Sequence, residues 1–305
     1  MPRRLIRDSH RRFGVPKPRI GCIVERRYLR QEMPQGVIRL LRAEGVDTDV
    51  LCTANGRFEP RRGVFRTGDG VEFDLNGYDG IVSRGRDALG LDMLCFADAV
   101  GLPAINTHAA TQRVRNKAQM AIELERAGIA AAPTILAADV AALAELPEEW
   151  FPLILKATYG DNSQGLRVAR RPEDLWDVHW ADDLVLAQHY LPNQGFDLKL
   201  YVCGERVFAS RKPSPFNGDR SAAARPARAD PHMVDLAMRC GQVFGLEVYG
   251  VDAVETADGV AVIEVNEFPN FTGVAEAARH IVDHVLARIA GRVAAPTTLA
   301  GAPPR

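Results

Sequence analysis

Val262-Ile263-Glu264-Val265-Asn266-Glu267-Phe268-Pro269-Asn270-Phe271 is the stretch of sequence that decides how the rest of the chain is interpreted. Its β-branched residues predict a strand, whose two-residue period puts Glu264 and Asn266 on one face, opposite Ile263 and Val265. A carboxylate and a carboxamide side by side suit magnesium, a hard cation that binds oxygen ligands and usually keeps substrate phosphates. Together with two isolated lysines upstream, this stretch predicts a site for ATP and magnesium.

Composition points to an ordinary soluble globular protein. The chain has 305 residues, enough for two domains or one large one, and is 47% hydrophobic and 25% charged. Its formal net charge of −1 gives no general bias toward nucleic acid or membranes. No apolar run reaches the roughly 20 residues needed to span a bilayer, and the basic start lacks the apolar core of a signal peptide. The five cysteines have no zinc-like spacing. We therefore expect a cytoplasmic protein that binds neither nucleic acid nor membranes.

The first third of the chain reads as an α/β domain. Apolar strands alternate with amphipathic helices, a pattern that predicts a parallel sheet with crossover helices. Ligands of such sheets lie beyond the carboxyl ends of the strands. Arg84 and Arg86 follow the third strand, so they either face a substrate carboxylate or phosphate or are ordinary surface arginines. The expected strands are 20–24, 46–51, 78–84 and 103–106, and the expected helices are 35–44 and 88–100.

The remainder mixes hairpins and helices. We expect one long helix over 108–129 with Lys117 inside it. The other expected helices are 140–146, 174–179, 231–244 and 275–289, and the expected strands are 133–136, 152–158, 184–190, 197–202, 206–211, 249–255 and 260–266. The resulting parts are a basic arm (1–17), an N-terminal α/β domain (18–107), a central lobe (108–185), a C-terminal lobe (186–291) with a mobile loop (213–231), and a disordered tail (292–305). The arm is either simply solvated or binds an anion or a partner.

Lys156 ends an apolar strand and is followed by a loop of small residues. A lysine there can neutralise nucleotide phosphates, while the glycines let backbone N–H groups close over them. Because the lysine precedes the glycines, this is not a Walker-type loop. Taken alone, Lys156 and Lys117 could each also be an ordinary solvated lysine without a role in binding. The loop residues expected to contact the nucleotide are Gly160, Ser163 and Gly165.

Two further segments fit a nucleotide site. The segment Gln188-His189-Tyr190-Leu191 ends a strand at a turn, where exposed backbone groups flanked by apolar side chains can hold adenine; His189 is also readily explained as a hinge or packing residue. Asp252 lies on the strand expected to pair with the one carrying Glu264, and can supply a third metal oxygen. A buried aspartate on a central strand is costly without a cation nearby, which favours this interpretation.

These residues, in this order, resemble the ATP-grasp enzymes over roughly residues 18–291. The closest resemblance is to ribosomal-protein glutamate ligase and glutathione synthetase-like carboxylate–amine ligases. It implies a small parallel-sheet α/β domain followed by two α+β lobes that clamp ATP. The motifs that carry the resemblance are Lys117, Lys156 with its Gly-Ser-Gly loop, Gln188-x-Tyr190-Leu191, Asp197-x-Lys199, Arg211, Asp252 and Glu264-Val265-Asn266.

The resemblance also implies roles. Lys117 and Lys156 would contact the phosphates, residues 188–191 would hold adenine, and Arg211 would contact the transferring phosphoryl group and the acyl phosphate. Magnesium, with manganese as a substitute, would be bound by Asp252, Glu264 and Asn266, while Asp197 and Ile263 would contact the nucleotide and Lys199 would assist catalysis. The substrates would be a small-molecule or peptide carboxylate, which attacks the γ-phosphate, and an amine, which attacks the acyl phosphate. The resemblance leaves a homo-oligomer open.

Some residues depart from the ligase pattern. Lys199 stands where many such ligases have arginine, so a bidentate grip would be lost. The segments Arg211-Lys212-Pro213-Ser214 and Asn266–Phe271 also resemble inositol phosphate kinases, an ATP-grasp branch that phosphorylates hydroxyls. A small-molecule kinase is therefore the alternative, and a non-catalytic nucleotide-binding protein is a third. Asn270, Thr272 and Gly273 follow the metal strand and are candidates for acceptor contacts, and the loop 213–231 is a candidate lid over an anionic substrate.

Overall fold

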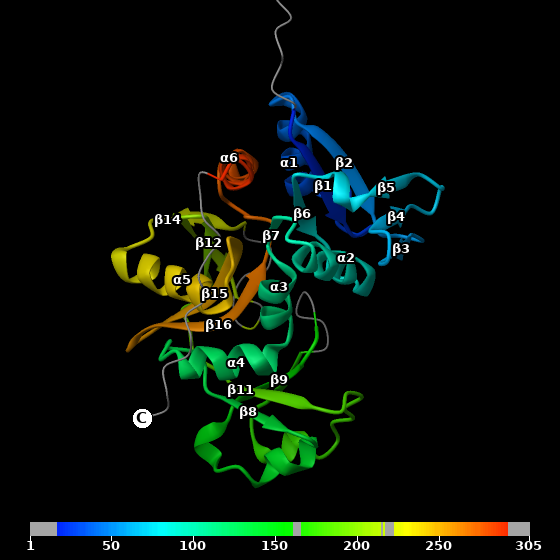
Figure 1. Cartoon of the computed structure of the whole chain (residues 1–305). Coiled ribbons are helices and arrows are strands. Elements are labelled where there is room, and N and C mark those ends of the chain that lie inside the picture. Colours follow the sequence, from blue (N-terminus) through cyan, green and yellow to red (C-terminus); the bar gives the residue numbers. More distant parts are fainter. Residues whose placement is uncertain (1–16, 161–165, 215, 217–222, 292–305) are drawn as a thin grey trace, which may run out of the picture.

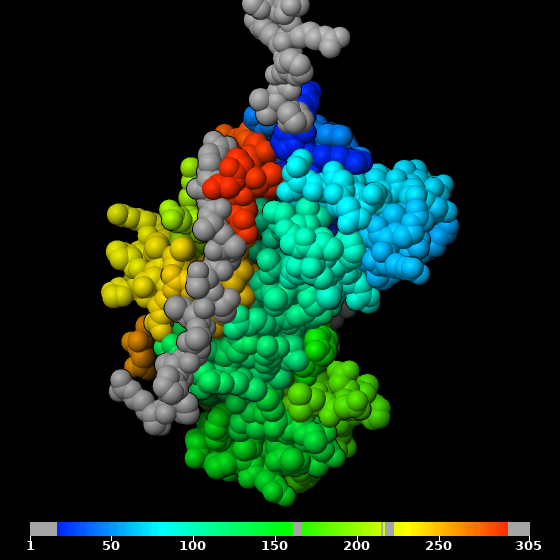
Figure 2. Space-filling view, in the orientation of Figure 1, coloured from blue at the N-terminus to red at the C-terminus, as the bar shows by residue number. Residues whose placement is uncertain are grey.

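The computed structural model describes residues 17–160, 166–214, 216 and 223–291, and within these ranges the chain forms four sheets and six α-helices. The N-terminal domain and the central lobe lie at opposite ends of the molecule, and the C-terminal lobe lies between them (Figures 1 and 2). No helix in these ranges is long and apolar enough to cross a membrane. Apart from Lys17, the predicted arm (1–17) and tail (292–305) lie outside the described residues.

The N-terminal domain is built on the predicted parallel sheet. Its strand order is β2-β1-β6-β7, and β1 is buried along almost its whole length because it pairs on both edges. Gly45 follows the first helix with a φ of 79°, a left-handed conformation that glycine adopts at little cost. The elements are β1 (Arg19–Val24), α1 (Glu32–Ala43), β2 (Asp47–Cys52), β6 (Gly80–Arg84), α2 (Ala88–Ala99) and β7 (Ala104–Ile105).

A small antiparallel sheet between β2 and β6 was not expected from the sequence. It consists of β3 (Arg57–Glu59), β4 (Val64–Arg66) and β5 (Glu72–Asp74), followed by the 3-10 turn η1 (Leu75–Gly77). These strands project to one side of the N-terminal domain in Figure 1. Phe65 is fully buried and stacks on Phe73, with the ring centroids 6.4 Å apart. This aromatic pair anchors the sheet, although its strands are short and charged.

The expected single helix over 108–129 is wrong. The structure has two helices, α3 (His108–Arg115) and α4 (Lys117–Arg126), separated by Asn116. Asn116 has a ψ of 99°, outside the helical range, and its side chain accepts a hydrogen bond from the Gln119 N–H at 3.0 Å. It is therefore the N-cap of α4. Lys117 is consequently the first residue of a helix, aimed at the site, rather than an interior helical residue.

The central lobe is an antiparallel sheet with the strand order β10-β9-β11-β8. One face carries buried apolar residues under 3-10 turns, and the other carries Lys156 and Gln188. The expected helix at 140–146 is a 3-10 helix, and the one at 174–179 is replaced by a 3-10 turn over Pro172–Leu175. The elements are β8 (Thr134–Ala137), η2 (Val140–Glu145), η3 (Glu148–Trp150), β9 (Leu153–Ala157), β10 (Arg167–Ala169), η4 (Pro172–Leu175) and β11 (Val185–His189).

The C-terminal lobe contains both predicted hairpins, joined in a sheet of strand order β14-β13-β12-β15-β16. Part of the expected mobile loop 213–231 is a strand instead, because Arg225–Ala227 pairs with β13. Helix α5 packs on one face of this sheet through the largest apolar core of the described chain. The elements are β12 (Phe196–Cys203), β13 (Arg206–Pro213), β14 (Arg225–Ala227), α5 (Pro231–Phe244), β15 (Val248–Thr256), β16 (Gly259–Glu267) and α6 (Ala277–Ile289).

Asn106 joins the N-terminal domain to the C-terminal lobe. Its amide donates to the Val248 carbonyl at 2.7 Å and accepts from the N–H groups of Glu247 and Val248 at 2.8 and 3.0 Å. The side chain is buried, so none of these groups can turn to water instead.

Replacing Asn106 with alanine is expected to lower the free energy of unfolding by about 2–4 kcal/mol, because three buried backbone groups lose their partner. Chemical denaturation monitored by circular dichroism measures this change. The exposed Asn76 of the same domain is the matched control, and its alanine variant should lose less than about 1 kcal/mol. Equal losses in the two variants would contradict the structural role of Asn106.

Candidate active site

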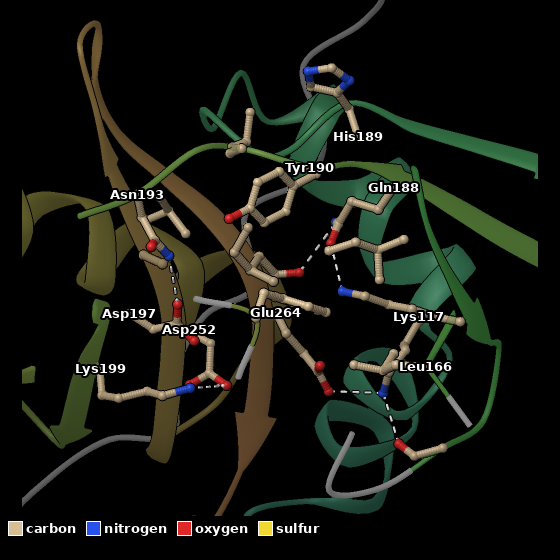
Figure 3. Close-up of a pocket in the computed structure, with 18 of the residues that line it drawn as sticks. Lys117, Leu166, Gln188, His189, Tyr190, Asn193, Asp197, Lys199, Asp252 and Glu264 are labelled. Atoms are coloured by element: carbon tan, nitrogen blue, oxygen red, sulfur yellow. Dashed lines mark hydrogen bonds and ion pairs between the residues drawn. The ribbon is translucent and has the colours of Figure 1, made fainter. Parts of the chain in front are cut away.

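A pocket lies between the open face of the central sheet and the β15–β16 hairpin of the C-terminal lobe (Figure 3). We call it the main pocket. Most of the residues predicted to bind the nucleotide or the metal line it, together with Lys199, which was predicted to assist catalysis. They are Lys117, Lys156, Gly160, Gln188, His189, Tyr190, Leu191, Asp197, Lys199, Asp252, Ile263 and Glu264. Ser163 and Gly165 lie outside the described residues.

A β-bulge in the hairpin sets the direction of the key carboxylate. Asp252 is paired with Glu264, but the next residue, Ala253, is paired with Val262, so Ile263 is an extra residue on β16. As a result Ile263 and Glu264 both line the main pocket, while Val262 and Val265 are buried in the core. The expectation that Ile263 faces away from Glu264 is wrong, because strict alternation does not hold across a bulge.

Lysines neutralise both carboxylates of the hairpin. Lys117 Nζ lies 2.8 Å from Glu264 Oε1 and also donates to the Gly160 carbonyl at 2.9 Å. Lys199 Nζ lies 2.7 Å from Asp252 Oδ2 (Figure 3). Burial opposes ionisation of Glu264, but the nearby charges of Lys117 and Lys156 outweigh it, so its pKa lies below the ordinary value. The stabilisation from ionised Glu264 is therefore complete above its ordinary pKa and is lost as the pH falls through the lowered one.

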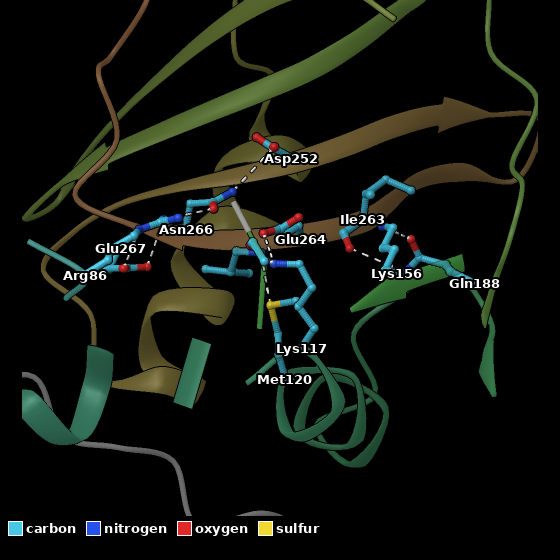
Figure 4. A network of polar contacts seen from close by, with 12 residues as sticks. Arg86, Lys117, Met120, Lys156, Gln188, Asp252, Ile263, Glu264, Asn266 and Glu267 are labelled. Carbon is cyan, nitrogen blue, oxygen red and sulfur yellow. Dashed lines mark hydrogen bonds and ion pairs between the residues drawn. The ribbon is translucent and has the colours of Figure 1, made fainter. Parts of the chain in front are cut away.

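Among the residues that the structure describes, Lys156 has no carboxylate as its hydrogen-bond partner. Its Nζ donates to Gln188 Oε1 at 2.6 Å, and both side chains are buried (Figure 4). Burial lowers the pKa of Lys156. Holding a buried ammonium against a neutral amide is costly, so the arrangement is typical of a group that receives a ligand anion.

Asp252, Glu264 and Asn266 lie together on the hairpin. The Asn266 Nδ2 atom is 3.5 Å from Asp252 Oδ2, and Asp252 is directly paired with Glu264. No group of three His, Cys, Asp or Glu residues in the described part of the chain is arranged to hold a metal ion. A cation here would take two carboxylates and an amide, a hard oxygen set that leaves room for phosphate and water ligands and suits magnesium.

Asp197 lies at the far wall of the main pocket. Its Oδ1 accepts a hydrogen bond from Asn193 Nδ2 at 3.0 Å, and Asn193 also lines the pocket. Burial raises the pKa of Asp197, and the charge of Lys199 only partly offsets this. An oxygen acceptor in this position, away from the lysines that surround Glu264, is suited to a hydroxyl donor.

Arg211 does not line the main pocket. It is paired across the hairpin with Leu198, whose side chain is buried in the core under α5, so Arg211 shares that face of the sheet. Its guanidinium binds Glu255 through two hydrogen bonds of 2.8 and 3.1 Å. The expected contact between Arg211 and a transferring phosphoryl group therefore does not fit the structure. The period of the strand puts Ser210 and Lys212 on the side of the sheet where Lys199 and Asp197 lie.

Substituting Arg211 by alanine is accordingly expected to change turnover less than about twofold, since only a surface ion pair is lost. Substituting Lys199 by methionine should reduce turnover roughly 10- to 100-fold, because Asp252 loses its half-buried charged partner. Steady-state release of ADP by the two variants, measured side by side, tests this contrast. A larger loss of turnover for Arg211→Ala than for Lys199→Met would support the predicted contact between Arg211 and the transferring phosphoryl group.

The predicted substrate residues divide into two groups. Arg84 stacks over the Tyr28 ring at 3.8 Å from its centroid and donates to Asn270 Oδ1 at 3.4 Å, and burial lowers its pKa. Arg86 pairs with Glu267 at 2.7 Å and donates to Asn266 Oδ1 at 3.2 Å (Figure 4), so it borders the candidate metal site. Thr272 and Gly273, in contrast, lie against Tyr201 and Ser210 and line neither the main pocket nor its neighbour.

Several lining residues were not predicted. Phe216 lines the main pocket and makes an edge-to-face contact with Tyr190, with ring centroids 5.8 Å apart. Its only signal in the sequence is an aromatic residue within a polar loop. Arg27 and Arg115 line an adjoining pocket, and no motif marks either of them.

Comparison with known proteins places this site in a family. Residues 114–289 match the model of the RimK-like ATP-grasp domain. A probable alpha-L-glutamate ligase of Pasteurella multocida is 30% identical over 64% of this chain and 67% of its own length. A second, of Alkalilimnicola ehrlichii, is 28% identical over 67% of this chain and 73% of its own. The ATP-grasp ligase PsnB, in complex with a minimal precursor, Mg and ADP, superposes with a TM-score of 0.66 at 18% identity, covering 89% of this chain and 98% of PsnB.

The expected fold is thus confirmed, as is the expected class of enzyme. The matched segment starts just before Lys117 and includes every lysine and carboxylate of the main pocket. The chain therefore belongs to the RimK-like ATP-grasp family of ATP-dependent carbon–nitrogen ligases.

Proposed function

We propose that this protein joins a carboxylate to an amine in a reaction that depends on ATP and magnesium and proceeds through an acyl phosphate. The observation that carries the proposal is the layer of charge in the main pocket. Lys117, Lys156 and Lys199 surround Asp252 and Glu264 between two sheets. Three ammonium groups beside two metal-binding carboxylates suit a magnesium-bound polyphosphate.

The nucleotide has a natural orientation in the main pocket. The N–H groups of His189 and Tyr190 already donate to the Pro133 and Pro152 carbonyls, so the next N–H along the hinge, that of Leu191, is assigned to adenine. Ile154 and Ile263 supply apolar walls for the base, and Asp197 an acceptor for the ribose. The phosphates then extend toward Lys156 and Lys117. The structure of PsnB in complex with Mg and ADP supports magnesium and an adenine nucleotide as the two ligands of the main pocket.

The chemistry follows from where the charges lie. An oxygen of the substrate carboxylate attacks the γ-phosphorus, the bond to the β-phosphate oxygen breaks, and ADP leaves. The nitrogen of the amine then attacks the acyl carbon, loses a proton, and expels inorganic phosphate. Lys117 and Lys156 neutralise the phosphate oxygens and hold them in line. Magnesium held by Asp252, Glu264 and Asn266 would supply further neutralisation of the β- and γ-phosphates.

The names of the relatives suggest glutamate as one substrate, and PsnB has been solved in complex with a precursor peptide, so we infer an amino acid joined to an acid or a peptide. The alternative, phosphorylation of a hydroxyl, uses the same pocket and differs only in the fate of the γ-phosphate, which stays on a hydroxyl oxygen of the product instead of being released as inorganic phosphate.

Phosphorus NMR distinguishes the two reactions. The γ-phosphate of ATP is followed with magnesium and panels of amino acids, acidic peptides and polyols. Free phosphate that appears only when a carboxylate and an amine are both present would support the ligase. Phosphate retained on a hydroxyl product would overturn it in favour of a kinase.

A further inference from the structure

A second pocket adjoins the metal-binding end of the main pocket. We call it the arginine pocket; its charged lining residues are Arg27, Arg86, Arg115, Lys117, Glu264 and Glu267. Lys117, Gly160 and Glu264 line both pockets, so the two cavities meet at the candidate metal site. A molecule in the arginine pocket therefore lies next to the phosphate end of the nucleotide.

The arginine pocket carries an excess of positive charge. Among the described residues, four cations but only two carboxylates line it, and each carboxylate already has a partner, Glu264 with Lys117 and Glu267 with Arg86. Arg27 is paired with Glu25, at 2.5 Å. A magnesium–ATP complex is a net anion, so at the shared end it would engage Lys117, whereas Arg115 lines only the arginine pocket and keeps its charge for another ligand. Positive charge consequently remains for a substrate.

Arg115 is the cation of this pocket with unused bonding capacity. Its Nε is buried and has no hydrogen-bond partner among the described residues. It is the last residue of α3, two positions before Lys117, and the cap at Asn116 fixes the chain between them. A guanidinium offers a planar fork of donors that matches a carboxylate or phosphate.

We propose that the arginine pocket selects a substrate bearing a second anionic group besides the carboxylate that reacts, and that Arg115 binds this second group. The proposal rests on the function proposed above. The reacting carboxylate must lie at the shared end, beside Lys117 and Glu264, where the γ-phosphate is expected. Arg115 lies on the wall of the arginine pocket beyond it, so one molecule with two acidic groups spans both positions. A neutral amide in place of the second acid would leave the half-buried guanidinium, with its buried Nε, without an anionic partner.

Binding and turnover are measured separately. For binding, calorimetry is run with magnesium and a non-hydrolysable ATP analogue present, titrating succinate, glutarate, L-glutamate or L-aspartate against butyrate, L-glutamine or L-asparagine. For turnover, hydroxylamine replaces the amine and traps any acyl phosphate as a hydroxamate. The variants are Arg115→Gln, which removes the charge, and Arg115→Lys, which keeps the charge but not the fork. Arg126→Gln on α4, an exposed position outside both pockets, is the control.

We expect the wild type to bind at least one diacid roughly 10-fold or more tightly than its monoacid or amide counterpart. Arg115→Gln should remove that preference, Arg115→Lys should keep part of it, and Arg126→Gln should keep all of it. No diacid preference in the wild type, or a preference unchanged in Arg115→Gln, would overturn the proposal, and in the second case Arg115 would merely stabilise the end of α3. Diacid binding without any hydroxamate would support the anion site but contradict the proposed ligase reaction. Equal amounts of hydroxamate from diacids and monoacids would support the ligase reaction but contradict the anion site.

Discussion

Replacing Glu264 with glutamine is expected to reduce turnover roughly a thousandfold while the fold stays intact. The amide keeps the size of the side chain but loses the negative charge that a cation bridging the phosphates needs. It also takes from Lys117 the negative charge that lies 2.8 Å away, although the amide oxygen can still accept its hydrogen bond. ADP release at saturating ATP and magnesium measures the loss, and thermal unfolding checks the fold.

Glu205→Gln is the matched control for this variant. Glu205 is an exposed residue in the turn between β12 and β13, and the same chemical change there should leave turnover unchanged. Wild-type turnover in Glu264→Gln, with an unchanged dependence on magnesium concentration, would refute the assignment of Glu264 to the metal.

Replacing Lys156 with methionine is expected to weaken ATP binding roughly 10- to 100-fold without lowering the melting temperature. The ammonium is buried against the neutral Gln188 amide, so its removal costs the nucleotide a charged contact but relieves the protein of a desolvated charge. Because only a protonated lysine attracts phosphate, the ATP affinity of the wild type should also fall as the pH rises through the lowered pKa of Lys156.

Calorimetric titration of Lys156→Met with the magnesium complex of a non-hydrolysable ATP analogue tests this role. Lys17→Met, at the exposed start of the N-terminal domain, is the control and should bind the analogue like the wild type. An unchanged dissociation constant for Lys156→Met would sink the assignment. A drop in melting temperature would instead show that Lys156 is structural.

Much of the fold could be predicted because its signals are local. Strands such as Leu153–Ala157 are short apolar runs between turn residues, and the hairpin carrying Asp252 and Glu264 is marked by β-branched residues on both sides of a glycine-containing turn. The order of lysines, hinge and carboxylates along the chain resembles that of ATP-grasp enzymes, and this resemblance predicted which residues line the main pocket. These signals need no knowledge of tertiary contacts.

The rest depended on single residues whose effect is set by tertiary structure. Asn116 interrupts a sequence that otherwise continues as a helix, because its side chain caps α4 and so aims Lys117 at Glu264. The extra residue at Ile263 is likewise invisible in an unbroken apolar run, since a bulge is defined only by the partner strand. Arg211 was assigned by position in a motif, but the register of β13 against β12 puts it on the other face.

The pairing of lysines with carboxylates has a consequence for the order in which ligands arrive. In the structure Lys117 pairs with Glu264 and Lys199 pairs with Asp252. These two lysines and the metal-binding carboxylates therefore neutralise one another before any ligand binds. A free cation would meet carboxylates already neutralised, and a metal-free polyphosphate would meet Lys117 and Lys199 already engaged by carboxylates, with Lys156 alone held by a neutral group. Only a preformed metal–nucleotide complex satisfies both sets at once. The binding of metal and of nucleotide should therefore be strongly cooperative, and by thermodynamic reciprocity each should tighten the other by the same factor.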